Sequence, residues 1–284
     1  MNKESLIKSV LSPDAFVISP LMGGMMNESC IVSSLGKKYV LYISTEQANE
    51  MVNRPLERDN QALVYSLGIT SKNVYFDVQK GIKINEFIEG SSLDKISQYD
   101  LKKVAKLLQI LHNCEKLSKD DYHPFARFVA YENEAKEFIK NQDTEYLKLR
   151  EIVFNNKDFL ESQKLVLCHN DAQKSNIVKS IDDKYYLIDF EFMGNNDPIY
   201  DIATFGNGSV EEGFTLLNEY SPNPSEDKVK RYYLWRMFVS LQWYNVALVK
   251  HYRGEGKIHN FDFLAVADYF LKNAQSAERY LSNI

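Results

Sequence analysis

Two short apolar segments, each ending in polar residues, constrain this chain more than any other feature. Residues 165–168 form an apolar run that leads into the tripeptide HND, and Asn176 follows five residues after Asp171. Residues 184–189 form a second run, KYYLID, which ends in the carboxylate of Asp189. Short apolar runs bounded by polar residues are typical of buried strands. The sequence therefore predicts two strands that present polar side chains at their ends.

These polar side chains suit one kind of chemistry, the transfer of a phosphoryl group to a hydroxyl. One carboxylate orients the attacking hydroxyl and takes its proton, while a second carboxylate and an amide hold the metal ions beside the nucleotide phosphates. Mg²⁺ prefers hard oxygen ligands and keeps several waters, so one Asp and one Asn suffice. Asn and Asp are also common where strands end, but the joint spacing favours Asp171 as the base and Asn176 and Asp189 as metal ligands.

The rest of the pattern indicates strands early in the chain and helices later. Four β-type runs are expected at residues 29–34, 38–44, 73–79 and 82–88. Helical patterns are expected at residues 46–67, 101–111, 128–159 and from about residue 211 onward. Pro55 interrupts the first of these helices and can mark its true start, and residues 89–92 are expected to form a turn or linker. The order predicts an α+β fold with a β-rich lobe over residues 1–90 and a larger helical lobe over residues 91–284.

Composition narrows the class of partner. The chain has 34 basic and 39 acidic residues, and a net charge of -5 gives no reason to expect nucleic-acid binding. We expect no membrane-spanning helix, because no run of about 18 apolar residues is present, and the first residues lack the apolar core of a signal peptide. Three widely spaced cysteines form no metal pattern and favour a reduced, cytoplasmic setting. The sequence leaves the oligomeric state open.

The motifs resemble those of the choline/ethanolamine kinase family, within a broader group that includes aminoglycoside phosphotransferases and protein kinases. CHNDAQKSN followed by LIDFEF is similar to the family signatures HND-x-x-x-x-N and IDFEY, and NNDPIYDIATF resembles the segment after them. LMGGMMNESCIV resembles the glycine-rich loop of the family, and KINEFIEG resembles its interlobe hinge. The resemblance runs from about Leu21 to the C-terminal helices. It implies a protein-kinase-like, two-lobed fold that binds ATP and Mg²⁺ between its lobes.

The resemblance also implies roles for individual residues. Asp171 matches the catalytic base, and Asn176 and Asp189 match the magnesium ligands. Gln173 and Glu191 match catalytic positions near the substrate hydroxyl and the metal. The implied nucleotide-binding positions lie in the glycine-rich loop, the early helix and the hinge, at Gly23, Gly24, Asn27, Glu57, Glu86, Phe87 and Ile88.

Two further roles concern the catalytic loop and the acceptor. Asp201 matches an aspartate that braces the catalytic loop. A quaternary ammonium such as that of choline is recognised by aromatic faces and nearby carboxylates. Trp243 matches the first of two family tryptophans, whereas the second falls at Val246, and Tyr244 is available beside it. Trp243 and Tyr244, with Gln173 and Glu191, are therefore the expected acceptor-binding residues.

Two positions depart from the family pattern on the side that binds the ATP phosphates. Where the family has Lys or Arg on the strand before the early helix, this chain has Tyr42, whose ordinary pKa of about 10 leaves it uncharged. Lys38 lies on the same strand face but about 13 Å away, and Arg54, close to Glu57 in sequence, is another possible substitute. Met26 replaces a Ser or Thr of the loop, and a thioether donates no hydrogen bond.

The sequence therefore predicts ATP-dependent phosphorylation of a small amino alcohol, with choline as the first candidate acceptor and phosphocholine as the product. One alternative is a phosphotransferase for another hydroxylated compound, such as ethanolamine, an aminoglycoside or a sugar. The other alternative, suggested by the changes at Tyr42 and Met26, is a catalytically weak, kinase-like binding protein.

Overall fold

The computed structural model describes residues 2–21, 27–93, 97–256 and 261–283. The chain folds into two compact units, each assembled from separate segments. Unit 1 contains residues 1–95, 114–120 and 174–194, and unit 2 contains residues 96–113, 121–173 and 195–284. The chain thus passes from unit 2 into unit 1 directly after Gln173 and returns directly after Gly194.

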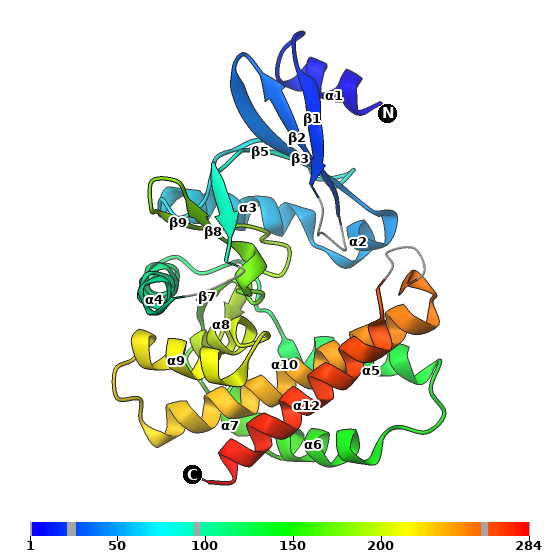
Figure 1. Cartoon of the computed structure of the whole chain (residues 1–284), viewed down its shortest axis with the longest axis vertical. Helices are drawn as coiled ribbons and strands as arrows, with labels where there is room; N and C mark the ends of the chain where they lie inside the picture. Colours follow the sequence, from blue (N-terminus) through cyan, green and yellow to red (C-terminus); the bar gives the residue numbers. More distant parts are fainter. Residues whose placement is uncertain (1, 22–26, 94–96, 257–260, 284) are drawn as a thin grey trace. The chain divides into compact units, whose positions relative to one another are not determined.

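Unit 1 is built on an antiparallel sheet with the strand order β1-β2-β3-β5-β4 (Figure 1). Its strands are β1 (Phe16–Leu21), β2 (Asn27–Ser34), β3 (Lys37–Ser44), β4 (Asn73–Asp77) and β5 (Ile82–Glu86). Helix α1 (Lys3–Val10) contributes Leu6 and Ile7 to an apolar core with Val32, Leu41 and Ile84 of the sheet. The predicted hairpin of β2 and β3 and the predicted strands β4 and β5 are confirmed. The sequence did not predict α1 or β1.

The predicted early helix is two helices, α2 (Glu46–Met51) and α3 (Arg54–Ser66). Asn53 caps α3, because its side chain accepts a hydrogen bond from the backbone N–H of Leu56, and Pro55 lies in the first turn. Proline is tolerated there because the first N–H groups of a helix have no intrahelical partner. Pro55 therefore marks the start of α3, as the sequence suggested.

A smaller sheet in unit 1 follows the order β6-β8-β9. Its strands are β6 (Gly90–Ser92), β8 (Ile177–Ser180), which follows the short helix η1 (Lys174–Asn176), and β9 (Tyr185–Leu187). The prediction of a turn at residues 89–92 is wrong, because Gly90 pairs with Ser180 across this sheet. A Cβ atom on Gly90 would lie only 2.2 Å from the carbonyl oxygen of Lys179, so close backbone approach requires glycine here.

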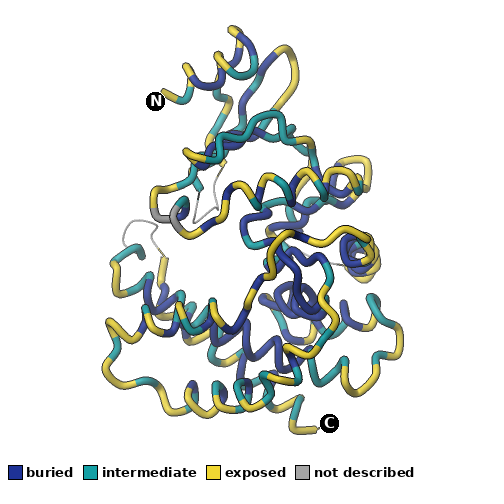
Figure 2. Tube along the Cα trace, turned by 180° about the vertical axis from the view of Figure 1, so that it is seen from behind, coloured by how far each residue is buried: buried dark blue, intermediate teal, exposed yellow. Residues whose placement is uncertain are grey.

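Unit 2 is mainly helical. Its elements are α4 (Gln98–His112), α5 (Pro124–Lys136), α6 (Thr144–Asn155), α7 (Lys157–Glu161), α8 (Pro198–Phe205), α9 (Val210–Tyr220), α10 (Glu226–Tyr252) and α12 (Phe263–Leu281), with the short strand β7 (Val166–Cys168) paired with β10 (Gly194–Asn196). Helices α10 and α12 lie side by side (Figure 1), and α10 is buried along most of its middle (Figure 2). The helical pattern predicted at residues 128–159 is confirmed, and it is divided among α5, α6 and α7.

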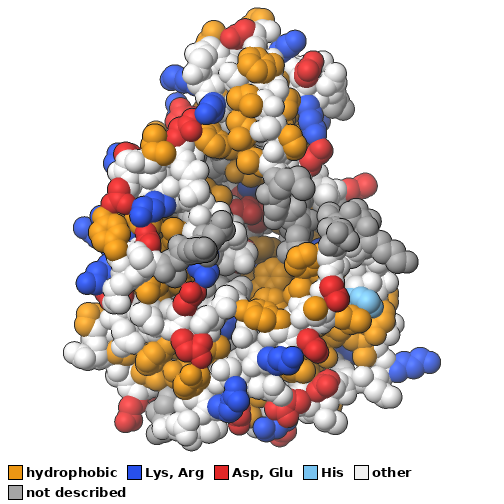
Figure 3. Space-filling view, viewed as in Figure 1, with side chains coloured by type: hydrophobic (Ala, Val, Ile, Leu, Met, Phe, Trp, Pro, Cys, Tyr) orange, Lys and Arg blue, Asp and Glu red, His pale blue; other side chains and the backbone are white. Residues whose placement is uncertain are grey.

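Strands in unit 1 and helices in unit 2 confirm the predicted α+β class. None of the helices in the described ranges combines the length and the apolar character needed to cross a membrane. Acidic and basic side chains are interspersed over the face shown in Figure 3. The division of the chain into lobes at residue 90 stays a prediction.

Candidate active site

The loop after strand β7 is held by hydrogen bonds to helix α8. The fully buried Asp201 accepts hydrogen bonds from the backbone N–H groups of His169, at 2.8 Å, and Asn170, at 2.6 Å. Thr204, one turn further along α8, accepts a hydrogen bond from the backbone N–H of Ala172 at 3.1 Å. Helix α8 therefore fixes the loop backbone on both sides of the predicted base.

The predicted base itself lies in this fixed loop. Asp171 accepts a hydrogen bond from Nε2 of Gln173 at 3.1 Å, and its backbone N–H donates to Nδ1 of His169 at 3.3 Å. Asn170, just before it, has a φ of 64°, a left-handed conformation that asparagine adopts more readily than most residues. Its Oδ1 accepts a hydrogen bond from Nδ2 of Asn196 at 2.8 Å. The structure therefore places Gln173 beside Asp171, the two residues that the resemblance associates.

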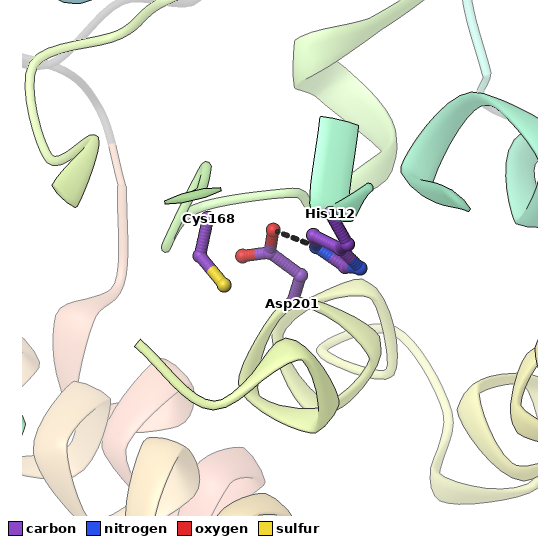
Figure 4. A group of neighbouring side chains, drawn as sticks. All are labelled: His112, Cys168 and Asp201. Carbon is purple, nitrogen blue, oxygen red and sulfur yellow. Dashed lines mark hydrogen bonds and ion pairs between the residues drawn. The ribbon is translucent and has the colours of Figure 1, made fainter. Parts of the chain in front are cut away.

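Three buried side chains meet behind this loop (Figure 4). Nε2 of His112 lies 2.9 Å from Oδ2 of Asp201, and Nδ1 of His112 lies 2.9 Å from the hydroxyl of Tyr220. The thiol of Cys168 donates to the carbonyl oxygen of Asn196 at 3.4 Å, and burial raises its pKa well above the ordinary value. Because both Asp201 oxygens already accept backbone N–H groups and the thiol keeps its proton, this cluster braces the loop and is unsuited to a metal.

Unit 1 contains a buried cluster of charged side chains. Nζ of Lys83, on β5, donates to Oε1 of Glu57 at 2.5 Å, and Nη1 of Arg54 donates to Oε2 of Glu57 at 2.7 Å. Nη1 of Arg54 also lies 3.2 Å from Oε1 of Glu191, and Nζ of Lys83 lies 3.6 Å from Oδ1 of Asp189. The cluster brings Glu57, Glu191 and Asp189, three residues singled out from the sequence, to one place.

The charges in this cluster set the protonation of its carboxyl groups. Burial opposes the charged form of Glu57, but Lys83 and Arg54 outweigh it and hold the pKa of Glu57 below its ordinary value. Burial lowers the pKa of Lys83, but the three carboxylates outweigh it and raise the net value. Burial, together with the charge of Asp189, raises the pKa of Glu191. Glu57 and Lys83 therefore form an ion pair, and Glu191 takes up a proton more readily than Glu57.

The two predicted metal ligands are joined by the start of the β8–β9 pairing. The backbone N–H of Ile188 donates to the carbonyl oxygen of Asn176 at 3.0 Å, which brings Asn176 next to the position of Asp189. Asp189 has a φ of 67°, and its Oδ1 is buried without a hydrogen-bond partner among the described residues. A carboxylate oxygen without a hydrogen-bond partner and the amide oxygen of an asparagine are hard donors of the kind that Mg²⁺ prefers. The residues present therefore fit a magnesium ion.

The sheet does carry a basic partner for Glu57, although β3 lacks one. This partner is Lys83, which the sequence did not predict. Lys83 lies directly opposite Tyr42 across the β3–β5 pairing. Lys38 instead forms an exposed ion pair with Glu89 at 2.9 Å. Arg54 does contact Glu57, as the sequence suggested for a substitute. Apolar and polar residues alternate along β5, and this pattern was the available signal for Lys83. Using it required knowing that β5 lies beside β3.

The predicted nucleotide-binding residues fall in three places. Asn27 contributes to the charged cluster, because its Nδ2 donates to Oε1 of Glu191 at 2.5 Å and its Oδ1 accepts from Ser44 at 2.9 Å. In the hinge, the backbone N–H groups of Glu86 and Phe87 are used by the sheet, through bonds of 2.9 Å and 3.1 Å to carbonyl oxygens. Ile88 follows directly after them. The remaining predicted residues, Gly23 and Gly24 together with the noted Met26, lie outside the described residues.

The predicted acceptor residues Trp243 and Tyr244 are half-buried on helix α10. The ring of Trp243 stacks on Phe270, with centroids 6.0 Å apart, and the ring of Tyr244 stacks on Tyr146, with centroids 5.1 Å apart. Adjacent helical residues point about 100° apart, so these two rings face different neighbours. Trp235, on the same helix, is buried and donates a hydrogen bond from Nε1 to Oδ2 of Asp197 at 2.8 Å.

Comparison with known proteins decides the family. The model of the choline/ethanolamine kinase family matches residues 18–224, which is more than half of the chain. The chain belongs to this family. It is 28% identical over 281 residues to the protein LicA of Haemophilus influenzae, covering 93% of this chain and 79% of that protein.

Solved structures agree with this family assignment. The choline kinase LicA of Streptococcus pneumoniae has a TM-score of 0.77 and 26% identity, over 99% of this chain and 98% of that one. A LicA structure in complex with AMP has a TM-score of 0.74 and 27% identity, over 99% and 96% of the two chains. An aminoglycoside 2'-phosphotransferase with GDP, at a TM-score of 0.70 and 12% identity, shares the fold, over 96% and 97% of the two chains. The predicted protein-kinase-like fold is therefore confirmed.

Membership of the family carries a general function with it. The protein is a choline/ethanolamine kinase-type phosphotransferase, which binds a nucleotide and transfers a phosphoryl group to an alcohol of a small substrate. The predicted enzyme class is therefore confirmed.

Proposed function

We propose that this protein transfers the γ-phosphate of ATP to the hydroxyl of choline and releases phosphocholine. Asp171 orients the hydroxyl and accepts its proton, and Gln173 fixes the carboxylate of Asp171 through its hydrogen bond at 3.1 Å. The observation that carries the proposal is the fixed loop around Asp171, whose backbone donates to two side chains of α8. A general base must be held within hydrogen-bond reach of the proton it takes, and this bracing supports that role.

Asn176 and Asp189 are the proposed ligands of Mg²⁺. A magnesium ion held by these two residues would neutralise negative charge on the nucleotide phosphates. Support for Asp189 comes from its buried Oδ1, which has no hydrogen-bond partner in the described part of the chain. Glu191 is a less suitable primary ligand, because Asn27 and Arg54 already contact its Oε1. Its proposed role is to hold these groups and the neighbouring Asp189 in position.

We propose choline as the acceptor because unit 2, which contains Asp171, is rich in aromatic side chains. A quaternary ammonium donates no ordinary hydrogen bond and is bound by aromatic faces. Burial raises the pKa values of Tyr122 and Tyr131, and the charge of Asp171 acts in the same direction. Trp243 and Tyr244 are the further aromatic candidates from the family pattern. The S. pneumoniae relative, which is named a choline kinase, supports the same acceptor.

The cellular setting that fits this proposal is the cytoplasm, where ATP and free thiols are present. The three cysteines, Cys30, Cys114 and Cys168, are all unpaired. Disulfides are rare in reducing compartments, so free cysteines support this location.

The decisive experiment measures ADP release with a panel of acceptors. Choline, ethanolamine, an aminoglycoside and a sugar are each supplied with ATP and Mg²⁺, and EDTA is added to matched reactions. We expect turnover with choline that EDTA abolishes and that an Asp171→Ala variant lacks. Turnover with ethanolamine alone rejects choline as the acceptor. ATP binding without turnover of any acceptor favours a catalytically inactive binding protein.

A further inference from the structure

Strand β5 places a lysine where strand β3 lacks a basic residue. Tyr42 and Lys83 are direct partners in the antiparallel pairing of these strands. Directly opposite residues project from the same face of a sheet, and Nζ of Lys83 lies 4.9 Å from the centroid of the Tyr42 ring. Burial raises the pKa of Tyr42 to about 12, so this ring is uncharged at neutral pH. Lys83 therefore supplies the positive charge at this point of the sheet.

The ammonium of Lys83 is held by an ion pair, but not all of its N–H donors form hydrogen bonds within the described ranges. Its side chain is 4% exposed, and within the described ranges its hydrogen bond is the one to Glu57, at 2.5 Å. A lysine ammonium has three N–H donors, so donors remain for a further acceptor. Oδ1 of Asp189, 3.6 Å from Nζ, has no hydrogen-bond partner among the same residues. The lysine thus lies beside the carboxylate proposed to hold the metal.

Arg54, the other buried cation of the cluster, is committed to protein groups. Its Nη1 donates to Glu57 and Glu191, at 2.7 Å and 3.2 Å. Its Nη2 donates to Oγ of Ser44 at 2.6 Å, and its Nε donates to Oδ1 of Asn49 at 3.2 Å. Each guanidinium nitrogen of Arg54 has a protein acceptor. These bonds use four of the five N–H donors of Arg54, so Arg54 mainly positions protein groups, whereas two of the three N–H donors of Lys83 form no hydrogen bond within the described ranges.

We propose that Lys83 binds the phosphates of the nucleotide in this chain, delivered from β5 instead of β3 and oriented by Glu57. The inference rests on the proposed ATP-dependent function. Phosphoryl-transfer enzymes of this kind use a lysine, paired with a helix glutamate, to hold nucleotide phosphates. In this chain the lysine that pairs with Glu57 comes from β5, and the opposite position on β3 is Tyr42. Tyr42 packs against the ammonium and takes no part in charge neutralisation.

A Lys83→Met variant separates phosphate binding from adenine binding. Equilibrium titrations measure the Kd of ATP, with Mg²⁺ present, and the Kd of adenosine. Hydrogen bonds to charged groups contribute about 1.5–3 kcal/mol, so the Kd of ATP should rise by about 10- to 100-fold. The Kd of adenosine, which has no phosphate, should stay within about twofold. Lys80→Met is the matched control, because Lys80 is exposed and pairs only weakly with Asp77, at 3.6 Å, and it should change neither Kd.

A paired exchange tests whether the lysine works from either strand. The double variant Tyr42→Lys, Lys83→Tyr returns the ammonium to β3 at the same level of the sheet. It should bind ATP at least tenfold more tightly than Lys83→Met. If Lys83→Met does not fold, which its thermal unfolding will show, the exchange variant and Lys83→Arg carry the test through the same two titrations. Both should then retain the wild-type preference for ATP over adenosine to within about tenfold.

Different results overturn the two proposals. The role of Lys83 is overturned if folded Lys83→Met binds ATP as tightly as the wild type. It is also overturned if the Kd values of ATP and adenosine rise by the same factor. An exchange variant that loses the preference for ATP also overturns it. A wild-type protein that phosphorylates no acceptor, yet binds ATP through Lys83, overturns the proposed function and leaves this inference standing.

Discussion

Replacing Asp201 by asparagine perturbs the loop around the predicted base with a minimal change in shape. Oδ2 of Asp201 accepts the N–H of His169 and lies beside Nε2 of His112, and Oδ1 accepts the N–H of Asn170. The amide nitrogen of asparagine donates, so one backbone N–H of the loop loses its acceptor whichever oxygen is replaced. An unsatisfied buried N–H costs about 1–3 kcal/mol. The free energy of unfolding should fall by that amount.

The same variant should slow catalysis, because the loop can regain its hydrogen bonds only by moving. Asp171 directly follows the affected Asn170, and a displacement of about 1 Å can cost about 100-fold in rate. We expect kcat to fall by about 10- to 100-fold, while the KM for ATP stays within about twofold. Urea unfolding and steady-state kinetics provide the two measurements. Asp182→Asn, at an exposed turn, is the control and should change stability by no more than about 0.5 kcal/mol. Wild-type stability and wild-type kcat in Asp201→Asn would contradict the bracing role of Asp201.

Two further predictions concern structure outside the catalytic loop. Gly90→Ala places a Cβ atom 2.2 Å from the carbonyl oxygen of Lys179, so it should destabilise the β6–β8 pairing by about 1–3 kcal/mol in urea unfolding. Burial opposes ionisation of Glu132, but the hydrogen bonds of Arg150, Lys136 and Tyr146 outweigh it and hold its pKa below 4.5. A depressed pKa in the folded state stabilises the protein above about pH 4.5, and this contribution is lost as the pH falls through the folded pKa. Glu132→Gln should therefore lower stability at neutral pH and flatten its decline in acid; an unchanged acid profile would contradict the role of this cluster.

The candidate site was predictable where its residues are close in sequence. Asp171, Gln173 and Asn176 lie within six consecutive residues. Asp189 ends the second apolar run of the sequence, which contains strand β9 in the structure. Spacing singled out Asp171, Asn176 and Asp189, because the chemistry needs particular side chains at strand ends, whereas Gln173 was predicted from the family resemblance. The apolar pattern similarly predicted β2 and β3, whose core side chains alternate with the pleat.

The remaining features depend on contacts between distant segments. Lys83 meets Glu57 because β5 pairs with β3, and the sequence alone does not specify this neighbour. Likewise, Asp201 reaches His112 from another helix, 89 residues away. Gly90 was expected in a turn because glycine favours turns, whereas it is required here by close approach of two strands. Sequence patterns report local conformational preferences, whereas the identities of these residues depend on contacts with distant segments.

The division of residues 128–159 into three helices has a local cause that the pattern reading overlooked. Asp143 caps α6 by accepting hydrogen bonds from the backbone N–H groups of Glu145 and Tyr146. An aspartate at this position is a common helix-start signal.

The most direct test of the proposed function identifies the phosphorylated product. Wild-type protein and an Asp171→Asn variant are each incubated with ATP, Mg²⁺ and choline, and phosphorus NMR follows the products. The wild type should form phosphocholine and ADP in equal amounts, and the variant should be slower by about 100-fold or more, since general base catalysis contributes about 100- to 10,000-fold. Formation of ADP and inorganic phosphate without phosphocholine, or wild-type rates in Asp171→Asn, would contradict phosphoryl transfer to choline through Asp171.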